Sequence, residues 1–126
     1  MESSAKFESK AISVVSLWTE KMEDTLAFYA NFLGLKRCQC SSYHMKPPHF
    51  EIKGTFLAIL HGKQEYRESS DHFPVIAITV DDLEKTCNEL EKNGVKIIKG
   101  IQEDESSKWT FCRDPGNNLI ELCIWK

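Results

Sequence analysis

The sequence predicts an α+β fold made of two similar halves, each with one strand, one helix and then three strands. Two spacings repeat along the chain. Met22, at the start of the first predicted helix, follows Val14 of the strand before it, and Leu83 follows Val75 at the same interval in the second half. A glycine suited to end a helix then follows each helix start at nearly the same interval. An internal repeat of this kind fixes the architecture.

In the first half, a strand rich in Val and Ile is predicted over residues 12–19. The helix after it is indicated by four side chains on one helical face, namely Met22, Leu26, Tyr29 and Leu33. Three further strands follow, and Pro47 and Pro48 interrupt the chain between the first two of them. These strands are predicted over residues 36–43, 49–53 and 55–61.

The second half begins with a strand over residues 75–80. Either Asp81 or Asp82 can cap the next helix, and Asp81 has Glu84 at the position that completes a capping box. The buried face of this helix is predicted to hold Leu83, Cys87 and Leu90. The last three strands are predicted over residues 95–99, 109–113 and 119–124.

The strands have two unlike faces, because successive side chains of a strand point in opposite directions. One face is branched and aliphatic and belongs under a helix. Its residues are Val15, Leu17, Leu57, Ile59, Ile76, Ile78, Val80, Ile120, Leu122 and Ile124. The opposite face mixes small, polar and aromatic residues, and includes Glu121. A mixed face of this kind suits a concave cup that holds a ligand, so we call it the cup face.

Composition narrows the possible partners. Hydrophobic residues make up 41% of the chain, charged residues 28%, and the net charge is -3, as in an ordinary globular protein. No basic stripe predicts a nucleic-acid partner, and no apolar run of about 20 residues predicts a membrane helix. The polar stretch 1–10 does not resemble a secretory signal.

The five scattered cysteines are typical of small core residues in a protein of a reducing compartment, so a cytoplasmic location is expected.

Three motifs carry a resemblance to a known family. They are LAFYANFLGLK (26–36), VIAITVDDLEKTCNELEKNGVKI (75–97) and DPGNNLIEL (114–122). In this order they resemble the vicinal oxygen chelate superfamily, of the glyoxalase and bleomycin-resistance protein type. The resemblance implies one domain over 1–126, in which two βαβββ modules, about 11–62 and 74–126 with a linker at 63–73, form a cup-shaped mixed sheet. It also implies a homodimer, since this family commonly forms its cups in dimers.

The resemblance further implies where a divalent metal ion would bind. Metal-using members hold the ion with one inward side chain from each of four strands, and here these positions are Val14, Ala58, Val75 and Glu121. Only Glu121 can coordinate a metal, because Val and Ala have no donor atom. We therefore expect no cofactor and a metal-independent binder of a small organic molecule in the cup.

Two alternatives remain open. The chain could be a divalent-metal-dependent lyase or isomerase of the lactoylglutathione lyase type, with one ion on displaced ligands drawn from His49, Glu51 and His61. By strand alternation His61 falls on the aliphatic face, whereas His49 and Glu51 share a face. Alternatively, Glu121 could act as a general base without a metal, which makes it the one candidate catalytic residue.

The predicted ligand-binding residues are those expected on the cup face near these positions. They are Val14, Ser16, Trp18, Phe56, Ala58, Val75, Ala77, Trp109 and Glu121. The aromatic members could stack on a planar ligand, or could fill the cup or a dimer interface.

Overall fold

The structure is a computed structural model that describes residues 6, 12–38, 47–63 and 75–126. The chain forms two four-stranded sheets, with strand orders β1-β4-β3-β2 and β5-β8-β7-β6. The first sheet and its helices comprise β1 (Val14–Thr19), α1 (Met22–Ala27), the π-helical η1 (Phe28–Phe32), β2 (Lys36–Arg37), β3 (His49–Ile52) and β4 (Thr55–His61). The second comprises β5 (Ile76–Thr79), α2 (Leu83–Lys92), β6 (Ile97–Glu103), β7 (Ser107–Arg113) and β8 (Leu119–Trp125).

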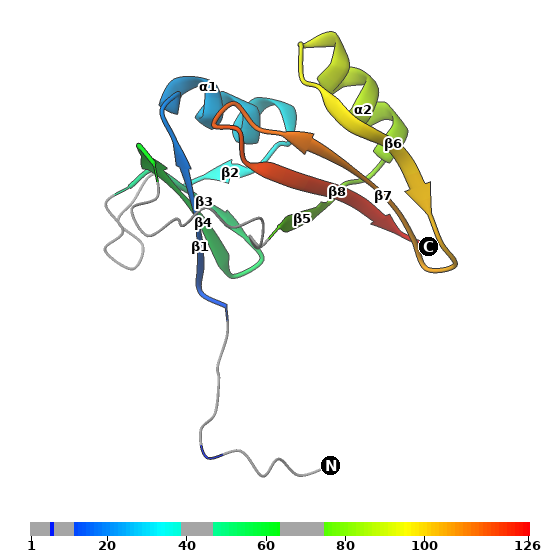
Figure 1. Ribbon diagram of the computed structural model, residues 1–126. Coiled ribbons are helices and arrows are strands. Elements are labelled where there is room, and N and C mark those ends of the chain that lie inside the picture. The colour runs from blue at the N-terminus through cyan, green and yellow to red at the C-terminus, as the bar shows by residue number, and fades with distance from the viewer. Residues whose placement is uncertain (1–5, 7–11, 39–46, 64–74) are drawn as a thin grey trace.

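The two sheets have the same topology. In each, the first and last strands pair in parallel, β1 with β4 and β5 with β8, and the other pairs are antiparallel. Figure 1 shows α1 and α2 on the same side of the molecule, above the strands in this view. The predicted fold class, two βαβββ modules with mixed sheets, is therefore confirmed, and the sheets are separate rather than closed into a barrel.

One hydrophobic core joins the two sheets. The aliphatic strand face predicted to lie under the helices does so, and Ile59, Ile120 and Leu122 are completely buried. The helices contribute Phe28 and Leu83, among others, to the same cluster. Each such side chain stabilises the fold by about 1.5–3 kcal/mol relative to an exposed one.

The first helix changes its winding midway. The amide of Leu33 donates to the carbonyl of Phe28 at 3.1 Å, a spacing of five residues that defines a π turn. Gly34, at φ +70°, then ends the helix. The uniform helix predicted from the apolar periodicity is therefore only partly correct. Tyr29, within this wider turn, is completely buried.

Asp82, not Asp81, caps α2. Its Oδ1 accepts a hydrogen bond from the amide of Lys85 at 3.0 Å. The capping box predicted between Asp81 and Glu84 is therefore wrong, because the helix starts one residue later than that motif requires. The predicted buried face of α2, Leu83, Cys87 and Leu90, is confirmed.

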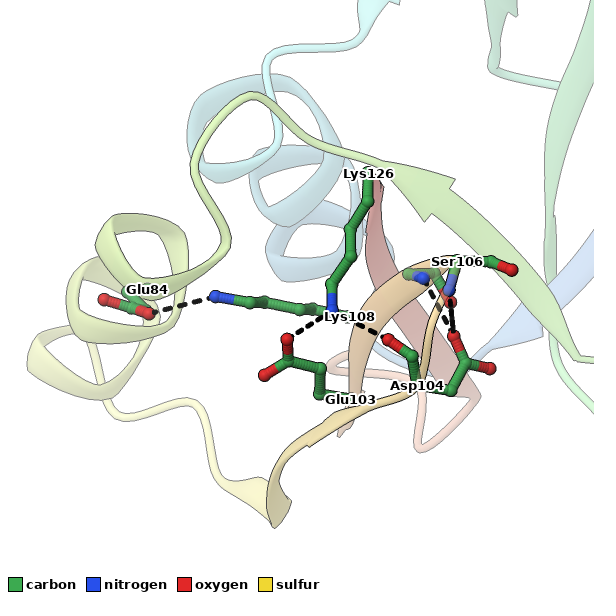
Figure 2. A network of polar contacts seen from close by, with 7 residues as sticks. Glu84, Glu103, Asp104, Ser106, Lys108 and Lys126 are labelled. Carbon is green, nitrogen blue, oxygen red and sulfur yellow. Dashed lines mark hydrogen bonds and ion pairs between the residues drawn. The ribbon is translucent and has the colours of Figure 1, made fainter.

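The β6–β7 hairpin is longer than predicted. β6 covers 97–103 instead of 95–99, and its pairing with β7 shifts register twice, which breaks the alternation on which the prediction relied. At the turn, Asp104 Oδ1 accepts hydrogen bonds from the amides of Ser106 and Ser107, both at 2.8 Å. Figure 2 shows Lys126 between Glu103 and Asp104, which ties the end of β8 to this turn.

Two predicted segments lie partly outside the described residues, namely the 36–43 strand beyond residue 38 and most of the 63–73 linker. Within the part of the chain that the structure describes, no helix is long and apolar enough to span a bilayer.

The β7–β8 turn holds the second sheet against the first. The Tyr29 hydroxyl donates to Asp114 Oδ2 at 2.7 Å, and both side chains are buried. Asn118 Nδ2 donates to Asp114 and also to the backbone carbonyl of Trp18, at 3.0 Å. Burial, followed by the nearby Asp114 carboxylate, raises the pKa of Tyr29 far above its usual range, so the hydroxyl stays a donor. We call Trp18, Tyr29, Asp114 and Asn118 the turn clasp.

Gly116 lets the turn clasp close. A Cβ atom at this position would lie 2.7 Å from both Cβ and Oγ1 of Thr19, at the end of β1. Thr19 cannot easily move away, because its hydroxyl accepts from the amide of Lys21 and lies 2.9 Å from the Thr25 hydroxyl. The backbone of the turn therefore approaches β1 as closely as only glycine permits.

We predict that Gly116→Ala destabilises the protein by roughly 1–3 kcal/mol, because the added methyl group forces the turn away from Thr19. Urea unfolding of the two proteins measures this difference. Gly100→Ala is the matched control, since a Cβ there meets nothing within 4 Å. Equal losses for the two variants would show that contact with Thr19 does not matter.

Candidate functional site

On the first sheet, the cup face contains a row of three side chains across three strands. Ser16 of β1 is in register with Ala58 of β4, and Ala58 is in register with His49 of β3. Residues in register share a face, so all three lie on the side opposite the core. Ala58 and His49 are buried, whereas Ser16 is half-buried. The row is therefore closed at its His49 end and more open at its Ser16 end.

Aromatic side chains flank this row. Trp18 is half-buried two residues beyond Ser16, and Phe56 is buried two residues before Ala58. The ring of Phe56 meets that of His49 edge to face, with ring centres 5.7 Å apart. Val14, in register with Phe56, is 40% exposed at the start of the strand.

His49 is the unusual member of the row. It is only 3% exposed, and its Nε2 atom has no hydrogen-bond partner. Its Nδ1 atom lies 2.9 Å from the backbone carbonyl of Pro47. A carbonyl only accepts, so Nδ1 carries the proton in the neutral ring and Nε2 is a bare acceptor. The sequence indicated that His49 and Glu51 share a face, and the register places both on the cup face.

On the second sheet, Glu121 lies at the centre of the cup face. It is in register with Ala77 of β5 on one side and with Phe111 of β7 on the other. Glu121 and Phe111 are half-buried and Ala77 is exposed. Among the contacts of the described residues, none uses the Glu121 carboxylate. The carboxylate therefore has an apolar neighbour on each side and is free to accept hydrogen bonds.

The neighbours of Glu121 along β8 extend this surface. Cys123 is in register with both Thr79 and Trp109, and its sulfur lies 3.8 Å from the Thr79 hydroxyl. Trp125, further along the same face, is 69% exposed. Val75, just before β5, is 43% exposed.

The nine predicted ligand-binding residues thus fall into two sets on separate sheets. The first sheet carries Val14, Ser16, Trp18, Phe56 and Ala58. The second carries Ala77, Trp109 and Glu121, and Val75 lies just before its strand β5. The turn clasp connects the two sets. Asn118 donates a hydrogen bond to the carbonyl of Trp18 in β1, and it directly precedes β8, the strand that carries Glu121.

Sequence reasoning missed three features of this face. Phe111 and Trp125 lie on the same side as Glu121, and strand alternation from Trp109 and Glu121 would have identified both. The third, the unpaired Nε2 of His49, carries no signal in the sequence, since it depends on how β3 packs.

The described side chains do not fit a divalent metal ion. Of the four positions implied by the resemblance, only Glu121 has a donor atom. Among the described residues, no three His, Cys, Asp or Glu side chains gather in a way that could hold an ion. The alternative ligands His49, Glu51 and His61 do not share a face either. His61 is in register with Thr19, on the face opposite His49 and Glu51.

The buried cysteines Cys87 and Cys112 are poor candidates for nucleophilic catalysis. Burial raises the pKa of Cys112 to about 12, and burial also raises the pKa of Cys87. Both thiols are therefore protonated at neutral pH and are weak nucleophiles.

Comparisons with known proteins agree with this fold. The family described as the Glyoxalase/Bleomycin resistance protein/Dioxygenase superfamily matches residues 11–122. Glyoxalase I of Saccharomyces cerevisiae (strain ATCC 204508 / S288c) is 34% identical over 67 residues, which are 53% of this chain and only 20% of that relative. The chain thus spans about a fifth of that protein's length.

Two solved structures share the fold over nearly their whole length. The antibiotic binding protein TnmS3 from Streptomyces sp. CB03234 is 18% identical, with a TM-score of 0.73 over 95% of this chain and 99% of its own. Lactoylglutathione lyase from Agrobacterium tumefaciens is 16% identical, with a TM-score of 0.67 over 93% of this chain and 95% of its own. With the family matching 11–122, this chain belongs to the glyoxalase/bleomycin resistance protein/dioxygenase superfamily.

Proposed function

We propose that the protein binds a small organic molecule on its cup faces without a metal ion. The observation that carries this proposal is the replacement of three of the four implied metal ligands by Val14, Ala58 and Val75. These apolar side chains cannot polarise a substrate, but they can contact one. Half-buried Trp18 and Trp109 add flat surfaces on which a planar ligand can stack, with a gain of about 0.5–1.5 kcal/mol for each ring pair.

Glu121 is the polar anchor of the second sheet in this proposal. Its carboxylate has small Ala77 on one side and the Phe111 ring on the other, so a ligand donor can reach it over Ala77. The printed name of the Streptomyces neighbour, an antibiotic binding protein, supports binding as a role that this fold can serve.

A metal-dependent lyase is the second candidate. The names of the yeast relative, Glyoxalase I, and of the Agrobacterium neighbour, lactoylglutathione lyase, favour it. It requires an ion, however, and the candidate donors are divided: His61 lies on the face opposite His49 and Glu51, and Glu121 lies on the other sheet. In this candidate Glu121 is a ligand or general base, which makes it the residue to change under either function.

Ligand binding is tested by a thermal-shift screen of small aromatic compounds in buffer with chelator. We expect at least one compound to raise the melting temperature, because a ligand that binds only the folded state stabilises it. Glu121→Gln should keep the melting temperature of the free protein. It should lower the affinity for that compound about tenfold, since a neutral amide cannot form the charge-assisted hydrogen bond. Glu105→Gln, an exposed carboxylate in the β6–β7 turn, is the control. Unchanged affinity of the Glu121→Gln variant would show that Glu121 does not bind the compound.

We also propose that the chain forms a homodimer through the exposed apolar surface at its second sheet. The support is the exposed apolar surface on the second sheet, with Trp125 69% and Val75 43% exposed. A second copy of the chain would remove this surface from water. Sedimentation equilibrium should give twice the 14.5 kDa chain mass. A monomer at all concentrations would contradict this assembly.

A further inference from the structure

A bulge in β6 brings a lysine to the cup face of the second sheet. From the pairing of Ile97 with Cys112, an unbroken antiparallel register would set Lys99 opposite Thr110, which is completely buried on the core face. The register shift between Ile97 and Lys99 sets Lys99 opposite Phe111 instead. Residues in register share a face, so the bulge moves this cation from the core face to the cup face. Bulges next to functional sites re-aim side chains in this way.

The second bulge in β6 has the same effect on Gln102. An unbroken continuation from Lys99 would set Gln102 opposite Lys108, on the core face, but the second shift sets it opposite Trp109. The cup face of β6 therefore presents Lys99 and Gln102 beside the rings of Phe111 and Trp109. Two polar side chains and two aromatic rings thus lie together near one edge of the sheet.

Opposite charges lie on the two sides of Phe111. One row across the sheet contains Ala77, Glu121, Phe111 and Lys99. Its outer members Ala77 and Lys99 are exposed, and Glu121 and Phe111 are half-buried, so solvent reaches the whole row. Among the described residues, no ion pair uses the Lys99 ammonium or the Glu121 carboxylate. Both charges are therefore available to a ligand.

The spacing of this row limits the size of that ligand. With strands about 4.8 Å apart, the Cα atoms of Glu121 and Lys99 are roughly 10 Å apart, with Phe111 between them. A single aromatic ring with a polar group at each end suits this separation, and it can stack on the Phe111 ring. Arg113, on the same face, is a second exposed cation, and one of its N–H groups donates to the Asn117 carbonyl at 3.2 Å. Positive charge on this side of Phe111 favours an anionic group there.

We propose that the cup face of the second sheet selects a small aromatic acid with a hydrogen-bond donor opposite its carboxylate. The carboxylate of the ligand accepts from the Lys99 ammonium, and its ring stacks on Phe111. The donor at its other end binds the Glu121 carboxylate, beside the small side chain of Ala77. A neutral compound of the same shape lacks the ionic contact with Lys99. The inference rests on the proposed function and names the chemical class of its ligand.

The test pair is para-aminobenzoate and para-aminobenzamide, because they have nearly the same shape and only the first is an anion at neutral pH. We expect the protein to bind para-aminobenzoate about fivefold more tightly at low salt in a titration followed by NMR, which corresponds to about 1 kcal/mol. Salt screens exposed charges, so this preference should shrink as salt is added. In ¹⁵N-labelled protein, the backbone amide of Phe111 and the indole N–H of Trp109 should be among the signals that move.

Lys99→Gln tests the ionic contact. Because Lys99 is exposed and has no described ion pair, this variant should keep the melting temperature of the wild type. It should bind the two compounds with equal affinity. Lys96→Gln, at an exposed site just before β6, is the matched control and should keep the preference for para-aminobenzoate.

Equal affinity of the wild type for the two compounds would overturn the inference, as would a preference that survives in Lys99→Gln. Either result would leave the proposed function standing, since both compounds would still bind. Binding of neither compound, or signals that move only on the first sheet, would also overturn the inference. The screen with Glu121→Gln tests the proposed function separately.

Discussion

The hydrogen bond from Tyr29 to Asp114 is the interaction on which the rest of the structure depends. It joins a helix of the first half to a turn of the second, across 85 residues of chain. Both groups are buried, so breaking the bond would leave the Tyr29 hydroxyl without its acceptor in the core and would take one donor from the Asp114 carboxylate, which costs more than the bond itself contributes. Tyr29 lies in the π-helical η1, and Gly116, two residues after Asp114, approaches Thr19 as closely as only glycine permits, so both partners of this bond stand next to unusual backbone geometry.

The same contact links stability to the site. Asn118, held by Asp114, donates to the carbonyl of Trp18, so the end of β1 and the start of β8 are fixed relative to each other. These two strands carry Ser16 and Glu121, one from each cup face. The position of Ser16 relative to Glu121 therefore depends on the turn clasp as well as on the two sheets.

Much of the fold could be predicted from local patterns. The repeat spacing and strand alternation identified both modules, the aliphatic face and the side on which Glu121 lies, because these depend on periodicity. Local patterns offered both Asp81 and Asp82 as helix caps but could not choose between them, and they could not identify the bulges in β6 or the role of Asp114. Each of these depends on a one-residue register or on a partner far along the chain.

The site was less predictable than the fold for the same reason. Strand alternation placed the nine expected residues on cup faces, but it could not show that they divide between two sheets. It also could not reveal the bare nitrogen of His49, which results from the Pro47 carbonyl occupying Nδ1. Residue type indicates what a side chain can do, whereas packing decides which of its atoms remain available.

We expect the cup to act without a metal ion. The most direct measurement is the metal content of untagged protein purified without chelator, repeated after Ni, Zn, Mn and Fe are added in turn and the excess is removed. We predict far less than one ion per chain in every case, because only one of the four implied positions has a donor side chain. One tightly held ion per chain would contradict it and would make the lyase the leading function.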